Sequence, residues 1–311
     1  MSLTAKPRIA YLILAHRYPE QLVRLVSRLN TESAVFLIHI DKKVSNAIYD
    51  SIVHQLSLHK NVYFIKRYTC YWAGFGIVEA CIQGIKELID QKIDFDFLAL
   101  LSGQDYPIKS NEYIESFFKK NIGTSFIHHN PFPFSEWGEE KGGWNRVNYW
   151  HLVRESRQYS YSTRNNFASG TISQRLLNRG INACAKLLPL TREFPNSFHP
   201  YGGAQFWCLY KTHVQQAYNT IQHNPQLVKF FRHVFVPDEI FFQTIAGNSS
   251  FKNNIHNDTL TFLEWYRPGA ILYASDMINI LKSEHLFARK FDTTVDAEVL
   301  DMIDTQILFK S

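Results

Sequence analysis

The first third of the chain alternates between two hydrophobic periods. Nearly continuous apolar runs at Arg8–Ala15 and Ala34–Ile40 predict strands buried on both faces, and shorter runs predict two more strands. These lie at Val62–Ile65 and Phe97–Leu101. Between them, apolar residues recur three and four positions apart, which predicts amphipathic helices over Tyr18–Asn30, Val44–Leu58, Ala73–Gln91 and Ser110–Lys119. This alternation with short connections indicates an α/β fold with a mainly parallel central sheet and flanking helices.

The pattern breaks down between Phe126 and Gly170. Prolines and glycines punctuate this stretch, which is rich in Trp, Tyr, His and Arg and is typical of loops that form binding surfaces or lids. Periodic structure then returns in predicted helices, one predicted strand and two closing segments. These are Ser173–Leu187, Lys211–Gln222, the strand Phe206–Tyr210, Ser283–Phe287 and Ala297–Ile307. No repeat or low-complexity linker divides the chain, so we expect a single domain over residues 1–311.

Composition narrows the function classes. A net charge of +5 suits a diphosphate ligand or an anionic membrane surface, but the cations are too dispersed for nucleic acid. The four cysteines include no C-x-x-C pair, which predicts free thiols in a reducing compartment. The early apolar run Ile9–Ala15 is much shorter than the roughly 20 residues of a membrane span. We therefore expect a cytoplasmic protein and leave open peripheral contact with the inner face of a membrane.

Polar and aromatic residues follow each of the four predicted strands. Ligands of open parallel sheets bind beyond the carboxyl ends of the strands, so these residues should converge on one site. They are His16, His39 and Asp41, Tyr71 and Trp72, and the segment Ser102–Asp105.

The sequence offers little for a divalent metal. The pair Asp94-Phe95-Asp96 precedes the fourth strand and so lies at the wrong end of the sheet, where a solvated turn is the simpler interpretation. Ser102–Asp105 contains one carboxylate, and His39 with Asp41 is a rival site of only two ligands, whereas hard cations prefer several oxygens. Asp41 is better suited to accept hydrogen bonds from a ribose or a uracil N–H. We expect no metal.

The segment Val236-Pro237-Asp238-Glu239, followed by apolar residues, has the pattern of a helix start. Acidic residues at that position complement the positive helix end, and this alone would explain both carboxylates. Alternatively, one carboxylate faces a cleft and acts as a general base, as inverting glycosyl transfer requires. We favour Glu239 for that role.

Two groups of cations near the C-terminus are flanked by aromatic residues. Arg267 lies in Trp265-Tyr266-Arg267-Pro268-Gly269, and Arg289 and Lys290 follow Phe287-Ala288. Such cations can stabilise a departing diphosphate, or they can be surface residues whose stems cover apolar atoms.

Seven segments in order make the chain resemble the family of core-2/I-branching N-acetylglucosaminyltransferases and peptide O-xylosyltransferases. They are IAYLILAH, FLIHIDKK, YWAGFGIVEA, LLSGQDYPIK, YGGAQFW, VPDEIFFQT and HLFARKFD, between Ile9 and Asp292. The resemblance implies a glycosyltransferase-A type fold that needs no metal or other cofactor. It also implies a nucleotide-binding part over residues 6–120, an acceptor and catalytic part over 121–292 and a C-terminal helix over 293–311.

The resemblance also implies roles for individual residues of this chain. Leu14, His16 and Asp41 would lie at the uridine, with Trp72 beside it, and Glu239 would be the base. Arg267 and Lys290 would bind the diphosphate. Gly202 and Gly203 would line the donor and acceptor cleft, where the missing Cβ permits close approach, together with Asp238 and, in a supporting role, Asp105.

By this resemblance the chain moves a sugar from a UDP-sugar to a hydroxyl of a glycan or lipid-linked glycan, with inversion. N-acetylglucosamine is the favoured sugar, with xylose and galactose open. We expect the protein to lack the membrane anchor and the disulfide-rich lumenal domain of animal members, and therefore to be a bacterial relative that builds surface polysaccharide. Contacts to the acceptor or donor sugar are expected from Glu139, Glu140, Arg146, Tyr149, Trp150, Arg154 and Arg157. Two alternatives are a non-catalytic carbohydrate- or nucleotide-binding module and a metal-dependent nucleotide-sugar hydrolase built on His39 and Asp41.

Overall fold

A computed structural model describes residues 6–154, 159–162, 191–264 and 267–308, with four single positions between 176 and 183. A seven-stranded sheet lies at the centre, in the order β12-β6-β11-β4-β1-β2-β3. Its strands are β1 (Ile9–Ala15), β2 (Ala34–Ile40), β3 (Val62–Phe64), β4 (Phe97–Ser102), β6 (Ser125–Ile127), β11 (Trp207–Tyr210) and β12 (Ile255–His256). Within this sheet β11 alone runs against its neighbours, β4 and β6, and the other pairs are parallel.

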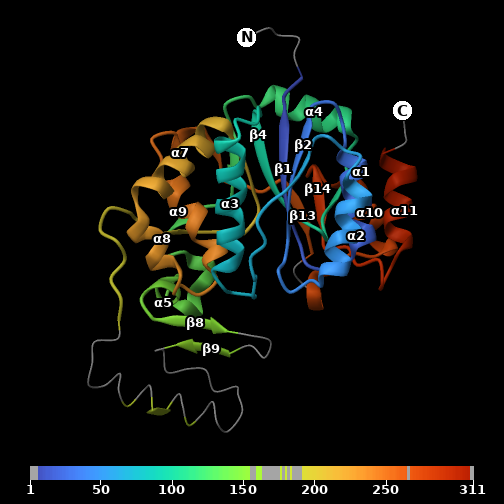
Figure 1. The fold of residues 1–311 in the computed structure, drawn as a ribbon. Helices are drawn as coiled ribbons and strands as arrows, with labels where there is room; N and C mark the ends of the chain where they lie inside the picture. Colours follow the sequence, from blue (N-terminus) through green and yellow to red (C-terminus); the bar gives the residue numbers. More distant parts are fainter. Residues whose placement is uncertain are drawn as a thin grey trace.

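Helices cover both faces of the central sheet (Figure 1). One face carries α1 (Pro19–Leu29), α2 (Asn46–Leu56), α10 (Met277–Lys282) and α11 (Glu298–Ile303). The other carries α3 (Gly76–Asp90), α7 (Lys211–His223), α8 (Pro225–Phe231) and α9 (Phe241–Gly247). The core is correspondingly double: Leu22 of α1 packs in one cluster with Ile13, whereas Val78 of α3 packs in the other with Leu12. Because side chains alternate along β1, one strand supplies both cores.

Smaller elements surround this layered core. A three-stranded sheet contains β13 (Thr261–Leu263), β14 (Phe287–Arg289) and β5 (Tyr106–Pro107), in that order. A two-stranded sheet pairs β10 (Tyr201–Gly202) with β7 (Asn130–Pro131). A hairpin joins β8 (His151–Arg154) and β9 (Tyr159–Ser162), and α4 (Asn111–Lys120) and α5 (Trp144–Val147) are further helices. The remaining short turns are η1 (Ser135–Glu140), η2 (Pro237–Glu239), η3 (Lys252–Asn254), η4 (Pro268–Ala270), η5 (Ala274–Asp276) and η6 (Asp304–Leu308).

The predicted α/β class with a mainly parallel sheet is confirmed, as are the four N-terminal strands and the helices between them. Treating the stretch after Phe126 as irregular was wrong at its start, because β6 belongs to the main sheet, between β11 and β12. Its three residues are too few to show a period. The predicted helix Ser173–Leu187 falls largely outside the described residues. Among the helices that the structure describes, none has both the length and the apolar composition to cross a membrane. Cys70, Cys81 and Cys208 are free thiols, as predicted.

Candidate active site

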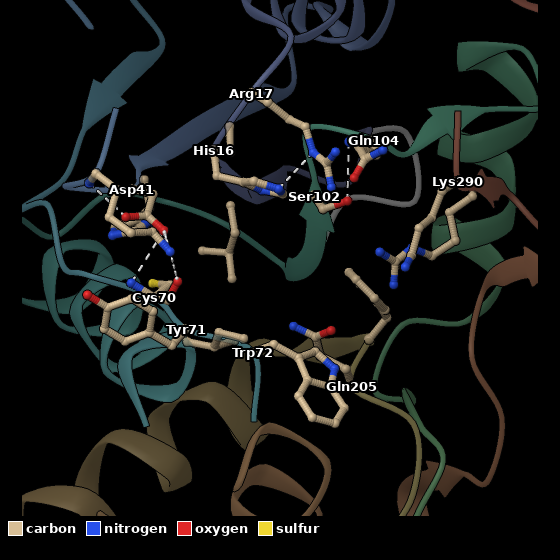
Figure 2. Close-up of a pocket in the computed structure, with 17 residues that line it drawn as sticks. His16, Arg17, Asp41, Cys70, Tyr71, Trp72, Ser102, Gln104, Gln205 and Lys290 are labelled. Carbon is tan, nitrogen blue, oxygen red and sulfur yellow. Dashed lines mark hydrogen bonds and ion pairs between the residues drawn. The ribbon is translucent and has the colours of Figure 1, made fainter. Parts of the chain in front are cut away.

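A pocket of about 330 Å³ opens at the carboxyl ends of the parallel strands. Its walls come from residues after β1, β2, β3 and β4, so the predicted convergence of the strand ends is confirmed. The lining residues are Leu14, Ala15, His16, Arg17, His39, Asp41, Lys43, Cys70, Tyr71, Trp72, Ile77, Ser102, Gln104, Gln205, Phe206, Arg289 and Lys290. In Figure 2, Asp41, Cys70 and Tyr71 lie at one end of the cavity and Lys290 at the other.

Asp41 is fixed at its end of the pocket by backbone amides. It follows β2 directly, is only 2% exposed, and accepts hydrogen bonds from the N–H groups of Lys43 (2.9 Å) and Cys70 (3.3 Å). The Lys43 ammonium lies 3.3 Å from the same carboxylate and 4.5 Å from the Tyr71 ring centroid. Lys43 therefore joins Asp41 to the aromatic wall formed by Tyr71.

His39 is buried behind Asp41, and its contacts indicate a structural role. Its Nε2 accepts a hydrogen bond from the Tyr68 N–H at 2.9 Å, and burial lowers its pKa to about 4. In the neutral ring, Nε2 already accepts this hydrogen bond, so the single proton is on Nδ1. Neither ring nitrogen then has a free lone pair for a metal, and His39 is poorly suited to bind one. Within the described residues, no cluster of three or more His, Cys, Asp or Glu side chains has the geometry of a metal site.

His16 and Arg17 form the wall between the two ends (Figure 2). The Arg17 Nε donates to His16 Nε2 at 2.9 Å, and burial and then the guanidinium lower the pKa of His16. His16 is therefore neutral near pH 7, and its ring is oriented by Arg17. The exposed indole of Trp72 lies opposite and packs edge-on against Phe235.

Arg289 and Lys290 supply positive charge to the other end of the pocket. Arg289 is held by the wholly buried carboxylate of Asp105, with Nε and Oδ1 2.9 Å apart, and its guanidinium lies 3.8 Å from the Phe206 ring centroid. Burial raises the pKa of Asp105 and lowers that of Arg289, and each opposes the shift of the other. The turn after β4 thus positions a pocket cation through Asp105. The supporting role of Asp105 in the donor and acceptor cleft stays a prediction.

The contacts of Arg267 differ from those expected. Its guanidinium binds Asp276 through two hydrogen bonds, of 2.5 and 2.6 Å, and it is not among the residues that line the pocket. Its segment is nevertheless close, because Ala270 and Lys290 are hydrogen-bonded through their backbones at 3.0 Å. In this structure the arginine that lines the pocket beside Lys290 is Arg289, and a contact of Arg267 with a diphosphate stays a prediction.

Glu239 lies on a short turn rather than in the first turn of a helix. Residues Pro237–Glu239 form the 3-10 turn η2, and α9 begins only at Phe241, so the predicted helix start at Pro237 was wrong. Val236, before the turn, has a left-handed φ of 50°, which is rare for a β-branched residue, and donates its N–H to the Ala73 carbonyl at 3.2 Å. The Glu239 carboxylate bonds the Arg146 guanidinium at 2.7 Å. The turn therefore connects the Trp72–Ala73 wall of the pocket to the segment around Arg146.

Asp238 points inward beside Glu239. It is 8% exposed, and burial, followed by repulsion from Glu239, raises its pKa to about 7. The two acids therefore have different environments, and Asp238 is substantially protonated near neutral pH.

Gly202 and Gly203 lie against the Glu239 turn, but the space left by their missing Cβ is filled by the protein. A Cβ on Gly202 would lie 2.5 Å from the Trp137 ring, and one on Gly203 would lie 1.7 Å from the His128 carbonyl oxygen. The Gly203 N–H donates to the Glu239 carbonyl at 3.0 Å. The missing Cβ atoms thus allow these glycines to pack closely on Trp137 and His128. A place for Gly202 and Gly203 in the donor and acceptor cleft stays a prediction.

The acceptor candidates are only partly described. Arg146 contacts Glu239, Tyr149 forms a β-bridge with Thr191, and Trp150 is 44% exposed. Arg157 and the side chains of Glu139, Glu140 and Arg154 lie outside the described residues. Sequence reasoning missed Arg17, Lys43 and Gln205 as lining residues, although each directly follows a recognised residue or lies within a recognised segment.

The family described as Core-2/I-Branching enzyme matches residues 9–286. The chain belongs to this family. This match confirms the family expected from the sequence, whose members are glycosyltransferases. Xylosyltransferase 2 of Rattus norvegicus is 24% identical over 324 residues, which cover 96% of this chain and 33% of the relative. Xylosyltransferase sqv-6 of Caenorhabditis briggsae is 21% identical over 99% of this chain and 38% of its own length. The chain thus spans about a third of these curated relatives.

Solved structures give weaker similarities. A nucleoside-diphosphate-sugar pyrophosphorylase from Vibrio cholerae RC9 aligns with a TM-score of 0.35 and 11% identity, covering 80% of this chain and 91% of that one. The mannosyltransferase Ktr4p from S. cerevisiae aligns with a TM-score of 0.33 and 13% identity, covering 82% and 68%. At these TM-scores neither similarity bears on the function.

Proposed function

We propose that this member of the family transfers a sugar from a UDP-sugar to a glycan hydroxyl, with inversion at the anomeric carbon. The observation that carries the proposal is the division of the pocket into two chemically different ends. Asp41 and the aromatic wall at one end suit a uridine, which offers N–H and hydroxyl donors and a flat face. Arg289 and Lys290 at the other end suit a diphosphate.

The charge of the pocket supports this assignment. Its described lining contains four cations, Arg17, Lys43, Arg289 and Lys290, against one carboxylate, Asp41. Positive side chains stabilise the charge that develops on a departing UDP, whereas a hard divalent metal usually takes more than one carboxylate and the described lining contains only Asp41. We therefore propose that leaving-group stabilisation comes from cationic side chains and that catalysis needs no divalent metal.

Glu239 is our proposed catalytic base. Its turn is hydrogen-bonded to Ala73, which follows the lining residue Trp72, and to Gly203, two residues before the lining residue Gln205. Glu239 itself does not line the pocket, so these backbone contacts support a position next to the pocket wall. It would accept the proton of the acceptor hydroxyl while that oxygen attacks the anomeric carbon and the bond to UDP breaks. Asp238, with its pKa raised to about 7, is the weaker candidate because it is more deeply buried.

The donor is to be identified by screening UDP-N-acetylglucosamine, UDP-xylose and UDP-galactose with glycan and lipid-linked glycan acceptors, with EDTA present and absent. We expect transfer with one donor and equal rates with and without EDTA. Loss of activity in EDTA that manganese restores would overturn the metal-independent mechanism. Binding of UDP without turnover of any donor would favour a binding module, and metal-stimulated release of free sugar would favour a hydrolase.

Substitution Glu239→Gln tests the base. It removes the proton acceptor while keeping the shape of the side chain, so we expect turnover to fall by about 10²–10⁴-fold with UDP affinity nearly unchanged. Wild-type turnover in this variant would show that Glu239 is not the base.

We further propose a bacterial role in surface polysaccharide synthesis at the cytoplasmic face of the membrane, which cell fractionation and glycan analysis of a deletion strain would test.

A further inference from the structure

We propose that Arg146 is a positioning residue that orients the Glu239 carboxylate, and that Trp137 holds Arg146 for this task. The inference rests on the proposed role of Glu239 as the base. It also changes the expected role of Arg146, from a contact to the substrate to a partner of the catalytic carboxylate.

The contact between the two side chains is direct and partly shielded from water. Arg146 Nη1 lies 2.7 Å from Glu239 Oε2, and the side chains are 13% and 27% exposed. A hydrogen bond between ionised groups at this depth is shorter and stronger than one on an open surface, and a guanidinium also fixes the direction of its donors. The ion pair therefore restricts the rotation of the carboxylate.

Trp137 restricts the guanidinium in turn. The Arg146 Cζ lies 3.6 Å from the centroid of a Trp137 ring, which places the cation directly over the indole face. That indole is packed edge-on against Phe132 and Phe134, and Gly202 approaches it so closely that any Cβ would clash. An arginine stem is flexible, but this one lies between a fixed ring and a fixed carboxylate.

The backbones of the two segments are also joined. The N–H of Phe235, one residue before the Glu239 segment, donates to the Arg146 carbonyl at 3.1 Å. At the other end of the turn, Gly203 donates to the Glu239 carbonyl. Arg146 and Glu239 thus belong to segments whose separation is set by backbone hydrogen bonds, so the side-chain contact does not depend on surface mobility.

Electrostatics gives a reason for a cation at this position. Glu239 follows the buried Asp238, whose pKa is raised by burial and by Glu239 itself, while Arg146 and Arg289 oppose that rise. Arg146 therefore lies where two adjacent acids would otherwise repel each other. Its charge favours the ionised form of Glu239, which is the form that accepts a proton.

The test compares Arg146→Met with wild type in UDP release from UDP-N-acetylglucosamine, or from whichever UDP-sugar the donor screen shows to be turned over. We expect kcat to fall by about 10²-fold with the KM for the donor within about threefold. Because the neighbouring cation is lost, the acidic limb of the kcat/KM profile should also move to higher pH. Arg146→Lys, which keeps the charge but not the planar stack, should lower kcat less and leave the limb in place.

The matched control is Arg232→Met. Arg232 also pairs with a glutamate, Glu79, at 2.9 Å and lies 5.0 Å from the Phe75 ring centroid, but its side chain is 50% exposed and does not line the pocket. This variant should leave kcat and the pH profile unchanged.

Three outcomes separate the possibilities. If Arg146→Met has the kcat and the acidic limb of the pH profile of the wild type while Glu239→Gln is inactive, Arg146 is not a positioning residue but Glu239 is still the base. If only the KM for the acceptor rises, Arg146 binds substrate instead. If Glu239→Gln retains turnover, the base assignment itself is wrong. Should Arg146→Met fail to fold, Arg146→Lys and Trp137→Phe carry the same comparison.

Discussion

Asp238 is a single residue whose titration should be visible in the stability of the whole protein. Its pKa is raised to about 7 in the folded state, chiefly by burial, whereas an unfolded aspartate titrates near about 4. The folded protein therefore binds the proton more tightly, and this group contributes stability below about pH 4 that is lost as the pH rises through about 7.

We predict that Asp238→Asn removes this loss. Relative to the wild type, the variant should gain up to about 2.5 kcal/mol of stability between pH 5 and pH 8, out of a total of about 4 kcal/mol between pH values below about 4 and pH 8. Urea unfolding at a series of pH values measures the difference. Asp94→Asn, at a side chain that is 77% exposed, is the control and should show no such trend. A constant difference between Asp238→Asn and wild type at all pH values would contradict the prediction.

For individual residues, the sequence predicted the pocket residues that follow the parallel strands better than those that reach the pocket from later segments of the chain. His16, Asp41 and Trp72 could be placed because the end of a parallel strand fixes where the next residues lie. Arg289 could be recognised as a cation, but its contacts with Asp105 and Phe206 join residues far apart in the chain, and no local pattern encodes them. The same limit applies to the pairing of Arg146 with Glu239.

Among the elements, the turn η2 depends on a close approach between two others. The Gly203 N–H binds the last residue of this turn, and a Cβ on Gly203 would lie 1.7 Å from the His128 carbonyl oxygen. We predict that Gly203→Ala lowers the free energy of unfolding by at least about 2 kcal/mol, because neither backbone can move away without breaking its own hydrogen bonds. Turnover should fall with it, since the displaced segment carries Glu239.

Thermal unfolding and steady-state kinetics measure the two effects. Gly138→Ala provides the control, because a Cβ there meets no atom within 4 Å, and its stability should change by less than about 0.5 kcal/mol. If Gly203→Ala were as stable as this control, the packing against His128 would not be what requires glycine.

The prediction of elements succeeded for the long periodic helices and failed for two of the shortest elements, although the three-residue strand β3 was predicted. Helices α1 and α3 show several turns of apolar spacing, whereas β6 has three residues and η2 has three. The proline and the acids before Phe241 resemble a helix start, but Val236 is left-handed and Ile240, with a φ of −131°, leaves the helical conformation between the turn and α9. Local sequence rules describe regular helices and carry little information about such a break.

For the molecule as a whole, binding at one pocket should stabilise the entire fold. A ligand that binds only the folded state at a concentration of 100 times its Kd adds about 2.7 kcal/mol. We predict that UDP raises the Tm and that Lys290→Met weakens UDP binding by about tenfold or more while leaving uridine binding unchanged, because in the proposed binding mode only the diphosphate reaches Lys290.

Calorimetric titration with UDP and with uridine measures both affinities. Lys60→Met, at an exposed lysine outside the pocket, is the control and should bind both ligands as wild type does. Equal weakening of UDP and uridine in Lys290→Met would show that the two ends of the pocket are not assigned to phosphate and nucleoside in this way.

The pocket joins the first strand of the sheet to the segment that follows β14, since Leu14 and Lys290 lie in the same lining. On the ribosome, the chain is made from its amino end, and strands β1 to β4 emerge long before β14. A nascent chain that still lacks Arg289 and Lys290 lacks the cationic end of the pocket, which the proposed function assigns to the diphosphate. On that assignment, affinity for a sugar nucleotide should arise only after β14 and Lys290 have been made, and a shorter chain should neither bind the donor nor consume it.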